Sequence, residues 1–242
     1  MDMKMFKKIS IGILAASFLS APAIAAPFTY FAEDLTPGNT VTATVEAKRN
    51  QFLGALSGGV GTEDFESFSD GTNNPALSFT GSSGAITATL SGSGEVEGNL
   101  PSAGRFATSG SKIYETGGGG DFSISFSTAI SAFGFYGTDI GDIGNQLTLR
   151  LTKSGGGIVD LAVGNGDSNG SLLFFGFIDT TDSYSMIQFL NNPGSGDVFG
   201  FDDMTIGDVG QIVNPPAVPL PAGGLLLISA LGGIAVARRR KS

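Results

Sequence analysis

Carboxylates near the start and the end of the folded body have the clearest potential for chemistry. Glu63, Asp64 and Glu66 form an acidic turn, and the pair Asp202 and Asp203 follows much later in the chain. Calcium binds about six to eight hard oxygen atoms, which carboxylates supply well. In a β-sandwich whose first and last strands are neighbours the two groups converge, so we predict a structural calcium site there. The alternative is solvated strand ends with one aspartate capping a turn.

Two further loops carry oxygen ligands. Asp139 and Asp142 lie in one glycine-broken loop, where a turn would bring both carboxylates onto calcium or let them cap the backbone. The stretch 165–170 begins like an EF-hand loop, with oxygen-bearing side chains at alternate positions and a glycine at the sixth. Its twelfth position is Gly176, where an EF-hand needs a bidentate glutamate, so we predict a turn instead.

Catalysis has one candidate pair, Glu95 and Glu97. In a strand they share a face about 7 Å apart, a spacing found between the two carboxyl groups of inverting glycosidases. The surrounding serines and glycines are equally typical of a solvated sheet edge. The chain has no His, Cys or Trp, which excludes a Ser-His-Asp triad, a thiol nucleophile and an ordinary zinc site. We therefore expect a protein that is not an enzyme, with a carboxylate-based glycosidase as the alternative.

The body of the chain is strongly acidic. Residues 26–217 contain 6 Lys and Arg against 21 Asp and Glu, so their formal charge is −15. Phosphate binding requires clustered cations, so this balance argues against nucleic acid as a partner. It favours solubility and an affinity for divalent cations.

Alternation of apolar and polar residues positions these carboxylates on strands. The segments with a period of two, separated by glycine-rich breaks, are 85–90, 121–127, 146–152, 158–163, 184–190 and 198–206. Many short strands at this spacing predict an all-β fold, an antiparallel two-sheet sandwich of jelly-roll or lectin-like type, over residues 50–210. Residues 26–49 receive no assignment, except that a short helix is expected around 45–56.

Two segments, 132–136 and 172–178, are apolar on both faces. This pattern predicts central strands, in which Gly134 and Gly176 make room for neighbouring aromatic rings. The alternative is an aromatic platform on which sugar rings stack.

The two ends of the chain read as targeting segments. Residues 1–25 combine early lysines, a short apolar run at 9–19 and a small-residue site, which predicts a signal peptide cleaved by signal peptidase after Ala25. Residues 211–219 form a proline-containing linker. The uncharged stretch 220–237 is about 27 Å long as a helix and precedes a basic tail, so we predict a transmembrane helix with the body outside. The tail consists of Arg238, Arg239, Arg240 and Lys241. The alternative is a buried C-terminal helix of the domain.

The motif Val218, Pro219, Leu220, Pro221, Ala222, followed by the apolar stretch and the basic tail, resembles a PEP-CTERM sorting signal of the VPLPA variety over residues 218–242. Leu220 stands where the commonest motif has Glu. The resemblance implies that the chain is an exported protein of a Gram-negative bacterium and that an exosortase-type membrane transpeptidase is one of its partners. It also implies anchoring in the inner membrane before processing, then a location at the cell surface or outside the cell, often with exopolysaccharide.

The segments 131–142, 173–179 and 200–206 resemble the single β-sandwich ectodomain that precedes such tails, which is similar in pattern to carbohydrate-binding and lectin-like jelly rolls. We therefore expect an exported cell-surface or extracellular-matrix protein with a structural or exopolysaccharide-associated role. The alternatives are a carbohydrate-binding lectin-like module and, third, a glycoside hydrolase or lyase.

Overall fold

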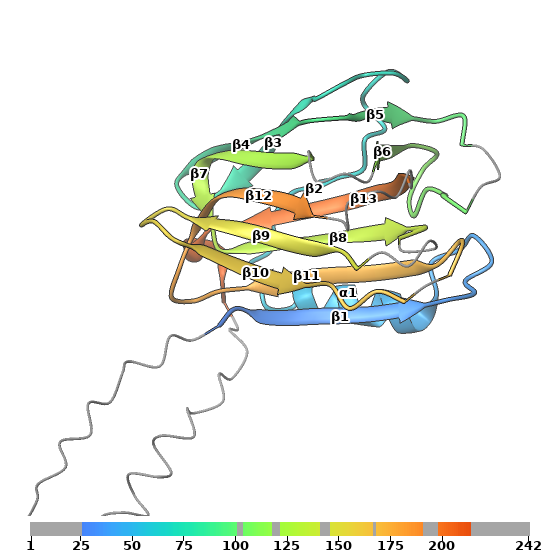
Figure 1. Ribbon diagram of the computed structural model, residues 1–242. Coiled ribbons are helices and arrows are strands. Elements are labelled where there is room, and N and C mark those ends of the chain that lie inside the picture. Colours follow the sequence, from blue (N-terminus) through green and yellow to red (C-terminus); the bar gives the residue numbers. More distant parts are fainter. Residues whose placement is uncertain are drawn as a thin grey trace, which may run out of the picture. The chain divides into compact units, whose positions relative to one another are not determined.

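The computed structural model describes residues 26–100, 104–117, 122–140, 146–166, 168–190 and 198–213 (Figure 1). The predicted signal peptide, most of the linker, the sorting motif, the apolar stretch 220–237 and the basic tail lie outside these residues, as does Asp142. No helix within the described ranges has the length and apolar character needed to cross a membrane.

Strands dominate the described chain. They are β1 (Phe28–Asp34), β2 (Thr62–Glu63), β3 (Ala76–Gly81), β4 (Gly84–Ser91), β5 (Gly94–Glu97), β6 (Ile113–Gly117), β7 (Ser123–Ile130), β8 (Ala132–Thr138), β9 (Thr148–Lys153), β10 (Ile158–Ala162), β11 (Leu172–Ile178), β12 (Tyr184–Leu190) and β13 (Val198–Gly207). One helix, α1 (Ala43–Leu53), and a short 3-10 turn, η1 (Val209–Gln211), complete the elements.

These strands form two antiparallel sheets that pack face to face. The first sheet has the order β1-β11-β8-β13-β6-β5, with β2 paired to β13, and the second has the order β10-β9-β12-β7-β4-β3. The predicted all-β, antiparallel, two-sheet fold is confirmed, and each of the six alternating segments overlaps a strand. The first strand, β1, pairs with β11 and lies in the region 26–49, which the sequence left unassigned.

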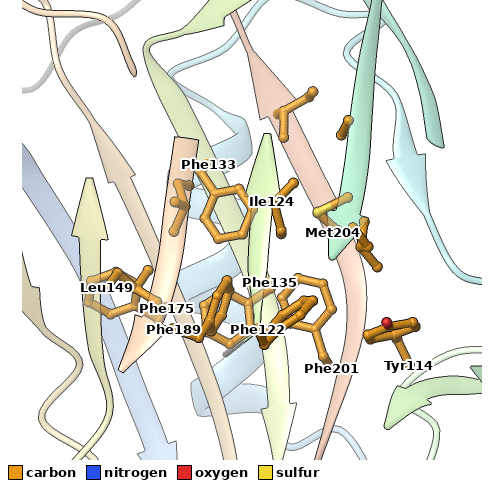
Figure 2. Close-up of a cluster of buried hydrophobic side chains, with 14 of the residues drawn as sticks. Tyr114, Phe122, Ile124, Phe133, Phe135, Leu149, Phe175, Phe189, Phe201 and Met204 are labelled. Atoms are coloured by element: carbon orange, nitrogen blue, oxygen red, sulfur yellow. The ribbon is translucent and has the colours of Figure 1, made fainter. Parts of the chain in front are cut away.

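Aromatic rings fill the space between the sheets. Phe135 and Phe201 of the first sheet, with ring centroids 4.9 Å apart, meet Phe189 of the second sheet (Figure 2). Phe122, just before β7, packs on Phe189, with their ring centroids 4.7 Å apart. All four rings are buried. The alternating segments therefore direct their apolar faces inward, as their period of two predicts.

The outer face of the first sheet is also covered, because α1 packs over β1 and β11 (Figure 1). Phe52 of α1 is buried against this face, and a Cβ at Gly134 would lie 2.9 Å from its ring. A Cβ at Gly176 would lie 3.1 Å from the same ring. The two glycines thus admit the ring, which confirms that β8 and β11 are interior strands buried on both faces. The alternative of a sugar-stacking platform on these strands is wrong, since their aromatic rings are all buried.

Register places both ends of the described chain at one end of the first sheet. The partners across that end are Phe28, Ile178, Ala132 and Gly207. The partners across the opposite end are Asp34, Leu172, Thr138 and Gly200. A seven-residue strand spans about 20 Å, so the loops after Asp34 and Thr138 lie that far from Phe28 and Gly207.

Candidate functional site

The two segments that carry the acidic groups assigned to calcium are neighbours, because β2 pairs with β13 in register Glu63 to Met204. The Glu66 carboxylate, however, accepts hydrogen bonds from the backbone N–H groups of Ser111 and Lys112, both at 2.6 Å. These bonds hold the pKa of Glu66 below its usual range. Glu63 accepts from the N–H of Phe65, and burial raises its pKa.

Asp202 and Asp203 are both buried, although regular alternation along a strand points neighbouring side chains to opposite faces. Asp203 has φ 49°, a left-handed conformation, and the register of β13 shifts between Asp202 and Thr205. This bulge breaks the alternation. Both carboxylates consequently meet the same segment: Asp202 accepts from the N–H and Oγ1 of Thr108 at 2.7 Å, and Asp203 accepts from the Ser109 hydroxyl at 2.8 Å.

Residues 104–112, which connect β5 to β6, are therefore held by carboxylates. An irregular segment has backbone N–H groups without ladder partners, and acidic side chains satisfy them here. The ammonium of Lys112 adds a cation at the acidic turn, where it donates to the backbone carbonyls of Glu66 and Phe68. Asp64 accepts from the N–H of Glu66 within the same turn.

Calcium at this position remains a prediction. Within the described residues, no three or more His, Cys, Asp or Glu side chains are grouped so as to hold a metal ion. If calcium binds the folded state alone, saturating it at about 100 times its dissociation constant stabilises the protein by about 2.7 kcal/mol. Thermal melts of the full chain after chelation, with and without added calcium, measure this. Superimposable melts with no calcium found by elemental analysis would contradict the prediction.

The buried Asp202 predicts a pH dependence of stability. Burial raises the pKa of Asp202 to about 7, the charge of Asp203 acts in the same direction, and the hydrogen bonds from Thr108 offset part of the effect. An acid whose pKa rises on folding contributes stability that is complete below its unfolded pKa of about 3.9 and is lost as pH rises through about 7. We expect the melting temperature to fall by several degrees between about pH 5.5 and about pH 8.5, at about 2–4 °C for each kcal/mol.

Thermal melts at both pH values, compared with those of Asp202→Asn, check this expectation. The variant cannot titrate at this position, so its slope should be flatter. Burial also raises the pKa values of Glu33 and Glu63, in the wild type and in the variant alike, so the difference between the two slopes reports on Asp202. A wild-type melting temperature that stays constant or rises over this pH range would contradict the assignment.

Asp139 lies directly after β8, at the end of the first sheet opposite to Phe28 and Gly207. It adopts φ 64° and is buried. Its carboxylate accepts from the N–H of Gly170 at 2.7 Å and lies 3.6 Å from Nη1 of Arg105. Nε of Arg105 donates to Glu115 at 2.7 Å. In the described residues Asp139 thus joins the loop 168–170 to the segment 104–112.

The remaining predicted residues lie elsewhere. Asn165 accepts from the N–H of Leu147 with its side chain, as a turn residue does. Glu95 is exposed on β5, at the edge of the first sheet, and Glu97 accepts from the N–H of Asn99. Neither glutamate lines the cleft described next.

A cleft of about 680 Å³ opens beside Asp139. Its lining comes from three loops, at residues 35–39, 104–106 and 168–170, together with Leu100. Arg105, Asn39 and Ser168 contribute polar groups, and Phe106 and Leu35 contribute apolar surface. Of these residues, only those in the turn 165–170 belong to a segment that the sequence singles out. They are far apart in the chain, and no motif marks them.

Two glycines let the cleft loops approach each other. Gly104 has φ 93° and Gly170 has φ 72°, conformations that favour glycine. A Cβ on Gly170 would lie 3.6 Å from the Cα of Gly104, and a Cβ on Gly104 would lie 2.2 Å from the Asp139 carboxylate. The loops 104–106 and 168–170 therefore touch through the backbones of Gly104 and Gly170, next to the buried carboxylate of Asp139.

No known protein family and no curated protein matches this chain. Among solved structures, the C-terminal family 22 carbohydrate-binding module of Clostridium thermocellum Xyn10B is similar at 14% identity and a TM-score of 0.37, over 64% of this chain and 98% of that one. A family 61 carbohydrate-binding module, TmCBM61, in complex with β-1,4-galactotriose is similar at 16% identity and a TM-score of 0.26, over 49% of this chain and 86% of that one. Neither likeness is high enough to transfer a ligand.

Proposed function

We propose that this chain is an exported cell-surface or matrix protein, sorted by an exosortase-type system, whose sandwich associates with extracellular polysaccharide through the cleft. The resemblance of residues 218–242 to a PEP-CTERM signal supports the export route. The carbohydrate-binding role, rather than a purely structural one, is supported by the cleft. The finer assignment to a jelly-roll or lectin-like module belongs to the same proposal.

The position of the cleft is the observation that carries the proposal. The cleft loops follow Asp34 and Thr138, whereas Phe28 and Gly207 lie at the other end of the same strands. The cleft therefore lies at the end of the first sheet opposite to the one where the described chain begins and ends. Loops gathered at one end of a sandwich are a common place for a binding site.

The cleft lining suits a sugar. Small-molecule sites combine apolar surface with a few placed polar groups. Leu35, which is 45% exposed, can contact the C–H face of a sugar ring, and the exposed Asn39 and the guanidinium of Arg105 can bond its hydroxyl groups. The side chain of Arg105 is fixed by two carboxylates, so little conformational entropy is lost on binding.

Retention of the full chain on immobilised exopolysaccharide of its host tests the binding role. Asn39 has φ 58°, so Asn39→Gly removes the amide while keeping a backbone conformation that glycine accepts. We expect weaker retention for this variant and unchanged retention for Asn73→Gly, an exposed asparagine outside the cleft. A wild-type chain that no polysaccharide retains would contradict the proposal.

Surface labelling of intact cells tests the export route. Replacing Pro219 and Pro221 by alanine should abolish sorting while leaving the described domain unchanged. A cytoplasmic, uncleaved full-length product would contradict this part of the proposal.

A further inference from the structure

The cleft contains a cation whose charge is already balanced. Among the described residues that line it, Arg105 is the only charged one. Nε donates to Glu115 at 2.7 Å, and Nη1 lies 3.6 Å from a carboxylate oxygen of Asp139, which is buried. Two carboxylates thus face one guanidinium, so the group carries a net negative charge when the acids are ionised.

None of the other Lys and Arg residues among the described residues lines the cleft. Residues 26–217 contain six Lys and Arg, all of them described, and each is engaged by the protein itself. The pairs are Lys48 with Gln51, Arg49 with Asp203, Arg105 with Glu115 and Asp139, Lys112 with two backbone carbonyls, Arg150 with Asp160, and Lys153 with Asp182. The described surface therefore lacks a basic patch, in a body of formal charge −15.

Arg105 nevertheless keeps hydrogen-bond donors. A guanidinium has five N–H groups, and those on Nη2 have no partner among the described residues. Its side chain is 10% exposed where it lines the cleft. Donors without net positive charge suit a hydroxyl or ring oxygen, whereas a carboxylate would be repelled by Glu115 and Asp139.

We propose that the cleft selects uncharged, hydroxyl-rich sugars and discriminates against uronic acids. This inference rests on the proposed polysaccharide-binding function and adds the class of glycan. It sets the ligand apart from the acidic polymers that a basic site would take, and it assigns the selectivity to the carboxylates that surround Arg105.

Matched trisaccharides test the selectivity. The pairs are β-1,4-mannotriose with β-1,4-trimannuronate, cellotriose with its glucuronate analogue, and α-1,4-galactotriose with α-1,4-trigalacturonate. Within each pair the members differ only in a hydroxymethyl or carboxylate group at C6. Calorimetric titration of the full chain, in a zwitterionic detergent, should show the neutral member of any binding pair bound at least about tenfold more tightly, as expected for one additional like-charge contact.

Two matched variants separate the effect of the carboxylates at Arg105 from the effect of the domain's overall negative charge. Glu115→Gln keeps an oxygen acceptor for Nε of Arg105 but removes one negative charge, which leaves Arg105 and Asp139 neutral together, so the preference for the neutral sugar should largely disappear. Asp160→Asn removes a charge from the exposed pair with Arg150 on β10, in the other sheet, and should leave the preference unchanged.

The outcomes distinguish this inference from the function on which it rests. Binding of no trisaccharide and no host polysaccharide overturns the proposed function, and the selectivity with it. Binding of uronates as tightly as neutral sugars, or more tightly, overturns the selectivity alone. A preference that Glu115→Gln leaves unchanged overturns the assignment of selectivity to the carboxylates at Arg105.

Discussion

Phe201→Ala should lower the free energy of unfolding by about 3–5 kcal/mol, the usual range for a buried Phe replaced by Ala. The Phe201 side chain is fully buried, and its ring lies between the two sheets (Figure 2). It contacts Phe135 of the first sheet at 4.9 Å between ring centroids and Phe189 of the second at 5.5 Å. The cavity left by Phe201→Ala is bounded by rings from both sheets, so it can close only if the backbone of a strand moves. Most of the loss in the free energy of unfolding should therefore remain.

Urea unfolding of the full chain measures this loss, and a melting temperature lower by on the order of 10 °C should accompany it. Phe28→Ala is the matched control. That side chain is 39% exposed at the start of the edge strand β1, so its removal should change stability by about 0.5 kcal/mol or less. Equal losses in the two variants would contradict the central place of Phe201 in the core.

Gly104→Ala should both destabilise the domain and abolish glycan binding. A left-handed conformation costs a residue with a Cβ about 1–2 kcal/mol. The new Cβ would also lie 2.2 Å from the Asp139 carboxylate, which is fixed by Gly170 and Arg105. Relieving such an overlap costs about 1–3 kcal/mol more, for a total of about 2–5 kcal/mol.

Gly59→Ala is the control for Gly104→Ala. Gly59 has φ 95°, nearly the value at Gly104, but a Cβ there would meet no atom within 4 Å. Gly59→Ala should lower the free energy of unfolding only by the cost of the left-handed backbone conformation, about 1–2 kcal/mol, and it should keep glycan binding. The difference between the two variants, measured by urea unfolding and by retention on polysaccharide, isolates the contact with Asp139. Retained binding in Gly104→Ala would show that this contact does not shape the site.

The strands were predictable because their signal is local. In the segment 121–127 the alternation of Phe122, Ile124 and Phe126 with serines is set by neighbours in the chain, and a strand with one buried face requires that alternation. Fully apolar segments such as 172–178 were also predictable, since a strand covered on both faces needs apolar residues at every position, and a run of about seven residues rich in aromatic side chains favours a strand over a helix. The first strand was not predicted, because in β1 the segment 28–34 mixes exposed, half-buried and buried positions without a clean period.

The roles of the carboxylates were not predictable. The sequence placed Asp202 and Asp203 on a strand, and regular alternation then implied opposite faces. The left-handed backbone of Asp203 and the bulge next to it reverse that implication, and both acids hold the segment 104–112. Such a bulge depends on partners across the sheet, which the local sequence does not specify.

The sequence by itself determined the β class, the acidic charge and the absence of His, Cys and Trp, together with the chemistry that these exclude. Only the tertiary structure decided where a ligand would bind. The cleft joins residues 35–39, 104–106 and 168–170, and it exists because Asp139 bridges two of those loops. Composition and the period of apolar residues are properties of a single stretch of chain. A cleft made by loops from three separate connections depends instead on the register between strands that are distant in the chain, because that register determines which loops lie side by side.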